Sequence, residues 1–92
     1  MTSAKPHPYK IGENYLIRTV TMIDIGKLEW VGEQELVLSS ASWIPETERW
    51  ADCLKDGKLR EIEPFPDGEV IIGRGAIIDA VRWIKRLPRE QK

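Results

Sequence analysis

Residues 15–44 constrain the fold of this chain more than any other segment. They read YLIRTVTMIDIGKLEWVGEQELVLSSASWI and contain three runs typical of β-strands, separated by two short turn-like segments. The first run is rich in β-branched and aromatic residues, which fit the half-buried surface of a pleated sheet. No apolar spacing of three or four residues, the mark of an amphipathic helix, interrupts the runs. The segment therefore predicts a small, curved, antiparallel sheet built as a meander.

Two glycine-containing segments are expected to turn the chain within this sheet. Residues 24–27 include Gly26, and glycine readily adopts the positive φ that several turn types need. Residues 32–34 form the second expected turn. Between the turns, Leu28 and Trp30 alternate with Glu29, which predicts a strand with one buried face.

A short helix is expected after the sheet, over residues 45–56. Pro45 suits a first helical position because its missing N–H has no partner there. Asp56 and Gly57 supply the helix stop. Strands are then expected over residues 59–63 and 69–72.

Residues 76–87, AIIDAVRWIKRL, carry the clearest helical pattern, and Pro88 ends it. The apolar residues of this predicted C-terminal helix cover a wider arc than the surface helix of a small domain needs. Either deep packing within the chain or contact with a second subunit explains such an arc. For the second case, the expected interface residues are Ile77, Val81, Trp83 and Ile84.

Length, charge and cysteine content exclude several classes of protein. The 92 residues suit one domain, which we place at residues 11–88, after a flexible segment of residues 1–10 and before a tail of residues 89–92. The 14 basic and 15 acidic residues are balanced, so duplex DNA binding is not expected. No apolar run approaches the roughly 20 residues that cross a membrane. The single cysteine cannot form an internal disulfide, which fits a reducing compartment such as the cytoplasm.

The chain offers little catalytic or metal-binding chemistry. Its one histidine, His7, falls in the expected flexible segment, whereas a catalytic group must be held in place. Cys53 falls on the apolar face of the first predicted helix, where a small core residue is expected. One cysteine and one histidine cannot build a zinc site. We therefore expect neither an enzyme nor a cofactor or metal.

Three sets of residues are candidates for binding a ligand. Arg74 lies between two glycines at a strand end, where backbone N–H groups and a guanidinium can hold an anion, although glycines at such a place more often form a plain turn. Trp43, Arg49 and Trp50 flank the start of the first predicted helix and can stack a base and neutralise a phosphate, or simply clamp the helix to the sheet. Arg18 stands in an otherwise apolar strand, as a ligand contact or as an edge residue.

Two resemblances add to this pattern. Residues 17–41, with G-K-L before the second strand and E-L-V-L-S-S-A closing the third, resemble the bent-strand core of Sm-like and SH3-like small barrels. The wider pattern of YLIRTVT, GKLEWVGEQELVLSSASWI and EIEPFPDGEVIIGRGAIIDAVRW resembles a family of small, uncharacterised accessory proteins of tailed phages and prophages. That resemblance implies a viral protein made in a bacterial host, often an oligomer that blunts host defence.

The fold expected from these observations is α+β: a curved antiparallel sheet forming an Sm- or SH3-like partial barrel, with one short helix and a C-terminal helix. The expected function is that of a non-enzymatic phage accessory protein in the host cytoplasm. It would self-associate and bind a small anionic ligand such as a cyclic nucleotide signal. The alternatives are a protein–protein interaction module for a host factor or virion component, and a weak binder of single-stranded RNA.

Overall fold

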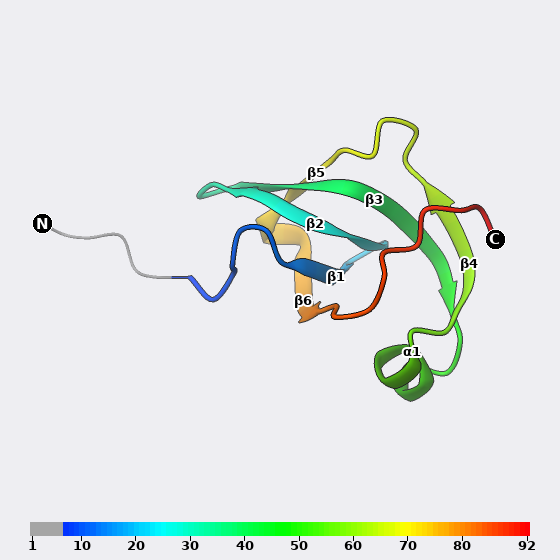
Figure 1. Cartoon of the computed structure of the whole chain (residues 1–92). Coiled ribbons are helices and arrows are strands. Elements are labelled where there is room, and N and C mark those ends of the chain that lie inside the picture. The colour runs from blue at the N-terminus through cyan, green and yellow to red at the C-terminus, as the bar shows by residue number, and fades with distance from the viewer. Residues whose placement is uncertain (1–6) are drawn as a thin grey trace, which may run out of the picture.

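The computed structural model describes residues 7–92 of the chain. Its elements are β1 (Asn14–Thr19), β2 (Ile23–Val31), β3 (Glu35–Thr47), α1 (Trp50–Asp56), β4 (Leu59–Pro64), β5 (Val70–Gly73), the 3₁₀ turn η1 (Arg74–Ala76) and β6 (Ile77–Arg82). Strands hold 51% of the residues and helix 12%, so the fold is built on a sheet rather than on packed helices. Figure 1 shows α1 at one end of that sheet.

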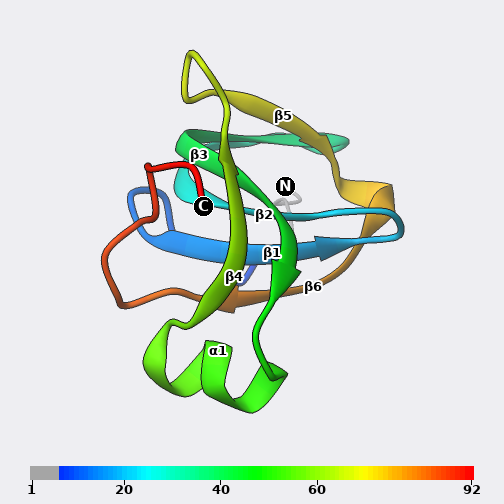
Figure 2. The same ribbon diagram turned by 90° about the vertical axis from the view of Figure 1, so that its right-hand side faces the viewer.

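The long, bent strand β3 organises the antiparallel sheet. The strand order is β4-β3-β2-β1-β6, and β5 pairs with β3 outside this path. The first half of β3 pairs with β5 and its second half with β4, so the two short strands continue from the same edge in different directions (Figures 1 and 2). Ser40 lies between the two halves with a positive φ of 48°, a left-handed conformation that helps the strand change direction.

The bend separates two apolar cores, and β1 contributes to both. Tyr15 and Ile17 pack into the first core, whereas Leu16 between them packs into the second. Three consecutive buried residues on one strand follow from the alternation of side chains between the faces of a sheet that is covered on both sides. The second core also contains Cys53 and Trp83, so it joins the sheet to α1 and to the C-terminal region.

The predicted C-terminal helix over residues 76–87 is wrong. The chain instead forms η1 and then β6, which pairs with β1 in an antiparallel register. Packing within the chain, one of the two expected causes, accounts for part of the apolar pattern: Ile77 and Ala80 pack against the first core, and Trp83 belongs to the second. The β-branched residues Ile77, Ile78 and Val81 suit a strand, and pairing with β1 overrides the local helical pattern.

The expected Sm- or SH3-like partial barrel is also wrong, because the sheet does not close into a barrel. The α+β class holds only in its coarse form, as a β-rich fold with one helix in place of the two expected. The bounds of two other elements also differ from expectation. Residues 24–27 are not a turn but part of β2, and the chain turns at residues 20–22. The helix begins at Trp50, because β3 continues through Pro45 to Thr47.

Four other expectations for local structure are confirmed, whereas Trp30, expected on the buried face of its strand with Leu28, is 51% exposed. The turn at residues 32–34 joins β2 to β3, and Gly32 donates its N–H to the carbonyl of Glu35. Gly57 ends α1 in the left-handed conformation, with φ of 75°. The strands predicted at residues 59–63 and 69–72 correspond to β4 and β5.

Residues 83–92 form an extended segment, here called the strap, that crosses the second core and returns to β4. Pro88 accepts a hydrogen bond from the buried hydroxyl of Ser42 at 2.6 Å. Lys92 and Ile62 exchange two backbone hydrogen bonds of 2.9 and 3.0 Å, which anchor the end of the strap beside β4. The strap thus covers one side of the second core.

Candidate functional site

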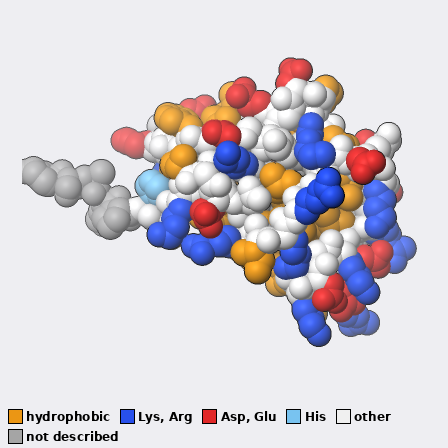
Figure 3. All heavy atoms as spheres, viewed as in Figure 1, with side chains coloured by type: hydrophobic (Ala, Val, Ile, Leu, Met, Phe, Trp, Pro, Cys, Tyr) orange, Lys and Arg blue, Asp and Glu red, His pale blue; other side chains and the backbone are white. Residues whose placement is uncertain are grey.

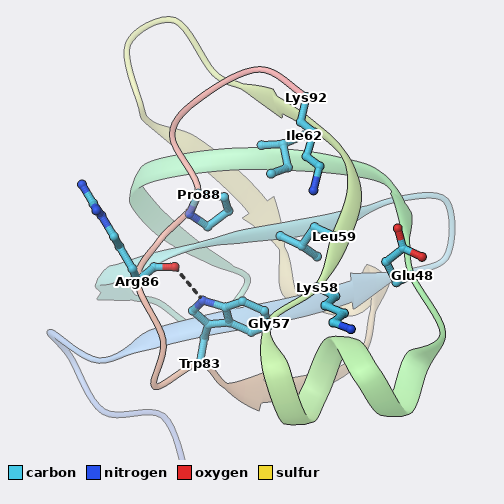
Figure 4. A pocket seen from close by; sticks show the side chains of 9 residues that line it. All are labelled: Glu48, Gly57, Lys58, Leu59, Ile62, Trp83, Arg86, Pro88 and Lys92. Carbon is cyan, nitrogen blue, oxygen red and sulfur yellow. Dashed lines mark hydrogen bonds between the residues drawn. The ribbon is translucent and has the colours of Figure 1, made fainter.

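A pocket of about 460 Å³ lies between the strap, β4 and the end of α1, and Figure 4 shows it. We call it the strap pocket. Its floor is apolar and consists of Leu59, Ile62, Trp83 and Pro88. The Trp83 side chain is 3% exposed, and its indole N–H donates to the carbonyl of Arg86 at 3.2 Å, so the floor is fixed in place. Pockets that bind small molecules combine such an apolar surface with a few polar groups.

The rim of the strap pocket is mainly cationic. Lys58, Arg86 and Lys92 line it, together with one acidic residue, Glu48. In Figure 4 Lys92 points from the end of the strap toward Leu59, whereas Arg86 lies on the side opposite Glu48 and its side chain extends away from the apolar floor. On the face drawn in Figure 3, Lys and Arg side chains surround an apolar area in the half of the molecule that holds the strap and β4.

The three rim cations differ from most other basic residues of the fold because they have no partner. Within residues 7–92, the side chains of Lys58, Arg86 and Lys92 take part in none of the hydrogen bonds and ion pairs. The acidic rim residue, by contrast, is engaged, since Arg60 lies 3.4 Å from a carboxylate oxygen of Glu48. Several basic side chains donate to backbone carbonyls instead: Arg74 to Gly32, Lys85 to Leu54, and Arg89 to Ala41 and Phe65. The rim therefore carries uncompensated positive charge.

A second hollow, of about 530 Å³, adjoins the strap pocket. The two share Ile62, Arg86, Pro88 and Lys92, and the second hollow is otherwise lined by strap residues only. The sequence prediction did not single out any of these cations. A signal was present, because the last ten residues contain four basic residues and one acidic residue. Their arrangement around a pocket depends on the strap returning to β4, which local sequence does not reveal.

The residues predicted to bind a ligand fall into separate places. Arg18 and Trp50 do meet, with the guanidinium 4.5 Å from the indole centroid. However, Arg18 is already neutralised by Asp79, to which it donates two hydrogen bonds, one of them 2.8 Å long. These hydrogen bonds hold the pKa of the Asp79 carboxyl below its usual value. The cation of this predicted site is therefore occupied by a partner within the chain.

Trp43 and Arg18 line a different hollow of about 420 Å³, here called the Trp43 cleft. Its other notable residues are apolar and exposed: Val20 is 70% exposed, Met22 47% and Ile78 63%. The Trp43 side chain is 36% exposed, so it is neither buried against the helix nor fully accessible to solvent. The cleft is thus an apolar surface with one neutralised ion pair beside it.

The remaining two candidate ligand residues lie elsewhere. Arg49 is exposed at the start of α1 and lines neither the strap pocket nor the Trp43 cleft. Arg74 donates to the carbonyl of Gly32 at 2.6 Å, and its guanidinium lies 5.7 Å from the ring centroid of Tyr9. It tethers η1 to the β2–β3 turn.

The four predicted interface residues differ in exposure. Trp83 is buried inside its own chain, and Ile77 packs against the first core. Val81 is half-buried, and Ile84 is 83% exposed. Only Ile84 offers a large apolar surface to a second copy, and self-association through these four residues stays a prediction.

Two further ionisable groups, a thiol and a carboxyl, are buried. Cys53 is a core residue, as predicted, and burial raises the pKa of its thiol, which keeps it protonated. Asp24 is the second residue of β2, lies directly opposite Ile17 and Trp43, and is 5% exposed. One of its carboxylate oxygens has no hydrogen-bond partner, and burial raises its pKa to about 6. Because Asp24 was assigned to a turn, the sequence prediction missed it.

Comparisons with known proteins identify no relative. No protein-family model, curated protein or solved structure matches the chain significantly. The resemblance to phage accessory proteins therefore stays a prediction. Within residues 7–92 no group of three or more acidic, cysteine or histidine side chains is placed to hold a metal ion. Helices long and apolar enough to cross a membrane are also absent from this part of the chain.

Proposed function

We propose that this chain is a non-catalytic binding protein that holds a small phosphate-bearing molecule in the strap pocket. The observation that carries the proposal is the presence of three cations without partners, Lys58, Arg86 and Lys92, around one apolar floor. A phosphate would supply the missing counter-charge, and a flat apolar part of the ligand would cover the floor. A cyclic nucleotide signal, the ligand implied by the resemblance to phage accessory proteins, belongs to this chemical class.

The absence of a partner makes the rim cations better candidates than Arg18. A ligand phosphate at Arg18 would have to displace Asp79, whose carboxylate already holds the guanidinium. At the strap pocket no such exchange is needed. The pocket volume of about 460 Å³ also lies within the range of small-molecule sites.

The proposal is tested by titrating adenosine 5′-monophosphate into the protein and following the indole N–H signal of Trp83 by NMR. We expect saturable shifts at Trp83 and its neighbours, weakened by added salt because screening reduces the attraction. The double variant Lys58→Gln/Lys92→Gln should bind about tenfold more weakly or worse. The matched control Lys27→Gln/Lys55→Gln removes the same charge from two exposed lysines outside the pocket and should bind like the wild type. Shifts confined to the Trp43 cleft, or equal losses in both variants, would overturn the proposal.

A second candidate function, a protein–protein interaction module, is favoured by the Trp43 cleft. Val20, Met22, Trp43 and Ile78 are exposed apolar residues that line one hollow. Contiguous exposed apolar surface of this kind marks interaction sites on soluble proteins. Sedimentation of the wild type beside Val20→Asp/Met22→Asp tests whether the partner is a second copy: a dimer that the variant dissociates supports it, and a wild-type monomer at high concentration excludes it.

A further inference from the structure

The outer edge of β5 is an unpaired strand edge. β5 pairs with β3 on one side only, and within residues 7–92 its backbone groups make no other backbone hydrogen bond. Figure 2 shows β5 along the upper margin of the sheet. Such an edge presents N–H and C=O groups at the spacing that an added strand needs. The edge of β5 can therefore pair with one further extended segment.

An exposed apolar row crosses the sheet and ends at this edge. Trp30, Val37 and Ile71 are register partners on β2, β3 and β5. Trp30 is 51% exposed and Ile71 is 62% exposed. The adjacent residues Leu36 and Ile72 belong to the first core, so the row lies on the other, solvent-exposed face of the sheet. An apolar side chain on an added strand would extend this row by one position.

The positions on either side of the apolar row are acidic. Glu35 and Glu69 share its face, because side chains two residues apart in an extended chain point the same way. Both are exposed, and within residues 7–92 neither takes part in an ion pair. The exposed charged residues of β2, Lys27 and Glu29, offset each other. The uncompensated charge beside the row is therefore negative, and it favours a basic partner.

Gly73 leaves a path from the edge to Glu35. The two residues are register partners, and a Cβ at Gly73 would meet no atom within 4 Å. Adjacent strands lie about 4.8 Å apart, so an added strand would lie about 10 Å from β3. A long basic side chain opposite Gly73 can cross the empty position and meet the carboxylate of Glu35. A second basic side chain, opposite Glu69, would meet that carboxylate directly.

From this arrangement we propose that the edge of β5 binds an extended segment of a partner protein with the pattern basic–x–apolar–x–basic. The apolar residue lies opposite Ile71, and the two basic residues lie opposite Gly73 and Glu69. The pattern reads the same in both directions, so it fits a parallel or an antiparallel strand. None of these three residues lines the strap pocket or the Trp43 cleft. The proposal is thus independent of the proposed function.

Three synthetic heptapeptides test the pattern. Thr-Lys-Thr-Ile-Thr-Lys-Thr carries it, Thr-Glu-Thr-Ile-Thr-Glu-Thr reverses the charge, and Thr-Thr-Lys-Ile-Lys-Thr-Thr moves both lysines to the face opposite the isoleucine. We expect the first peptide to shift the NMR signals of the Ile71 and Gly73 amides saturably. The other two should bind at least about fivefold more weakly, since each loses two charge pairs across adjacent strands.

Variants of the protein test the acidic partners. Glu35→Gln/Glu69→Gln should weaken the first peptide about fivefold. The matched control Glu61→Gln/Glu90→Gln removes the same charge from exposed positions on β4 and the strap, and it should bind like the wild type.

Methylated peptides test the strand edge itself. Methylating the amide nitrogens of alternate residues removes the donors along one edge of the first peptide. Of the two alternate forms, one should lose binding and the other should keep it, because only one edge pairs with β5.

Equal binding of the three peptides, equal losses in the two double variants, or equal behaviour of the two methylated forms would overturn the proposal. Failure of the first peptide to bind at millimolar concentration, or shifts confined to residues away from β5, would overturn it as well. A wild type that sediments as a dimer beside a monomeric Ile71→Lys would show that a second copy covers this edge, which also contradicts the proposal.

Discussion

Arg18 on β1 and Asp79 on β6 hold each other across adjacent strands. The two residues are register partners, and the guanidinium donates two hydrogen bonds to the carboxylate while it lies 4.5 Å from the ring centroid of Trp50. One arginine thus links β1, β6 and α1. Arg18, for which the sequence left open a ligand contact or an edge residue, thus has partners within the chain.

Removing that link should change the titration of Asp79. In Arg18→Ala the pKa of the Asp79 carboxyl should rise toward its ordinary value of 3.8, because the hydrogen bonds that lower it are gone. A lowered pKa stabilises the fold above pH 3.8 and ceases to do so as the pH falls through the folded-state pKa. Carboxyl carbon shifts measured by NMR between pH 2 and 6 test this. Arg60→Ala, which removes an exposed arginine paired with glutamates, is the control and should leave Asp79 unchanged.

The sequence predicted those elements whose boundaries are set locally. Gly57 ends α1 as expected, since glycine adopts the left-handed conformation without strain. Gly26 was assigned to a turn, but it lies within β2, where a glycine can serve a purpose other than turning the chain. A Cβ at Gly26 would lie 2.9 Å from the carbonyl oxygen of Ser39, so glycine there permits a close approach of β2 and β3. A glycine that permits the close approach of two strands cannot be distinguished, in a sequence, from a glycine that permits a turn.

The candidate site was harder to predict because long-range contacts assemble it. Lys58 follows α1, whereas Arg86 and Lys92 belong to the strap, and only the pairing of Lys92 with Ile62 brings them to one pocket. Because residues 76–87 were assigned to a helix, the return of the strap to β4 was not predicted. A helix over residues 76–87 would have buried Trp83 against a neighbour rather than beneath a pocket.

Asp24 should make the stability of the protein depend on pH. Its pKa is about 6 in the folded state against 3.8 for an ordinary carboxyl, so the folded state binds the proton more tightly. The free energy of unfolding should therefore fall as the pH rises from about 4 to 6 and level off above. The difference of about two pKa units corresponds to about 3 kcal/mol. Urea unfolding at pH 4 and pH 7 measures the change.

The variant Asp24→Asn isolates this effect, because its side chain stays neutral throughout. Its stability relative to the wild type should increase by about 2 kcal/mol between pH 4 and pH 7, because the unfolded-state carboxyl is already partly ionised at pH 4. Asp67→Asn, at an exposed position, should follow the wild type. If the wild type and Asp24→Asn keep a constant difference across this range, folding does not raise the pKa of Asp24.

Gly57 and Gly73 form a matched pair for testing backbone conformation. Gly57 has φ of 75°, and an added Cβ would lie 2.7 Å from Cδ of Lys85. Gly57→Ala should lower the free energy of unfolding by about 1–2 kcal/mol, mainly through the left-handed backbone. Gly73 has φ of −70° and open space around a new Cβ, so Gly73→Ala should cost nothing. Equal losses in the two variants would contradict this assignment.

The buried hydroxyl of Ser42 should hold the strap in place. It donates to the carbonyl of Pro88 at 2.6 Å, and Ser42→Ala leaves that carbonyl without its partner at a cost of about 1–3 kcal/mol. Because the strap continues to Lys92, we expect the loss to loosen the far anchor as well. The amide of Ile62, which donates to the carbonyl of Lys92 at 2.9 Å, should then exchange with solvent faster relative to the amides of β1 and β2. Hydrogen exchange followed by NMR measures this ratio. Ser39→Ala removes an exposed hydroxyl bonded to Glu29 and should leave the ratio unchanged. An Ile62 amide that keeps its wild-type protection in Ser42→Ala would show that the two ends of the strap are anchored independently.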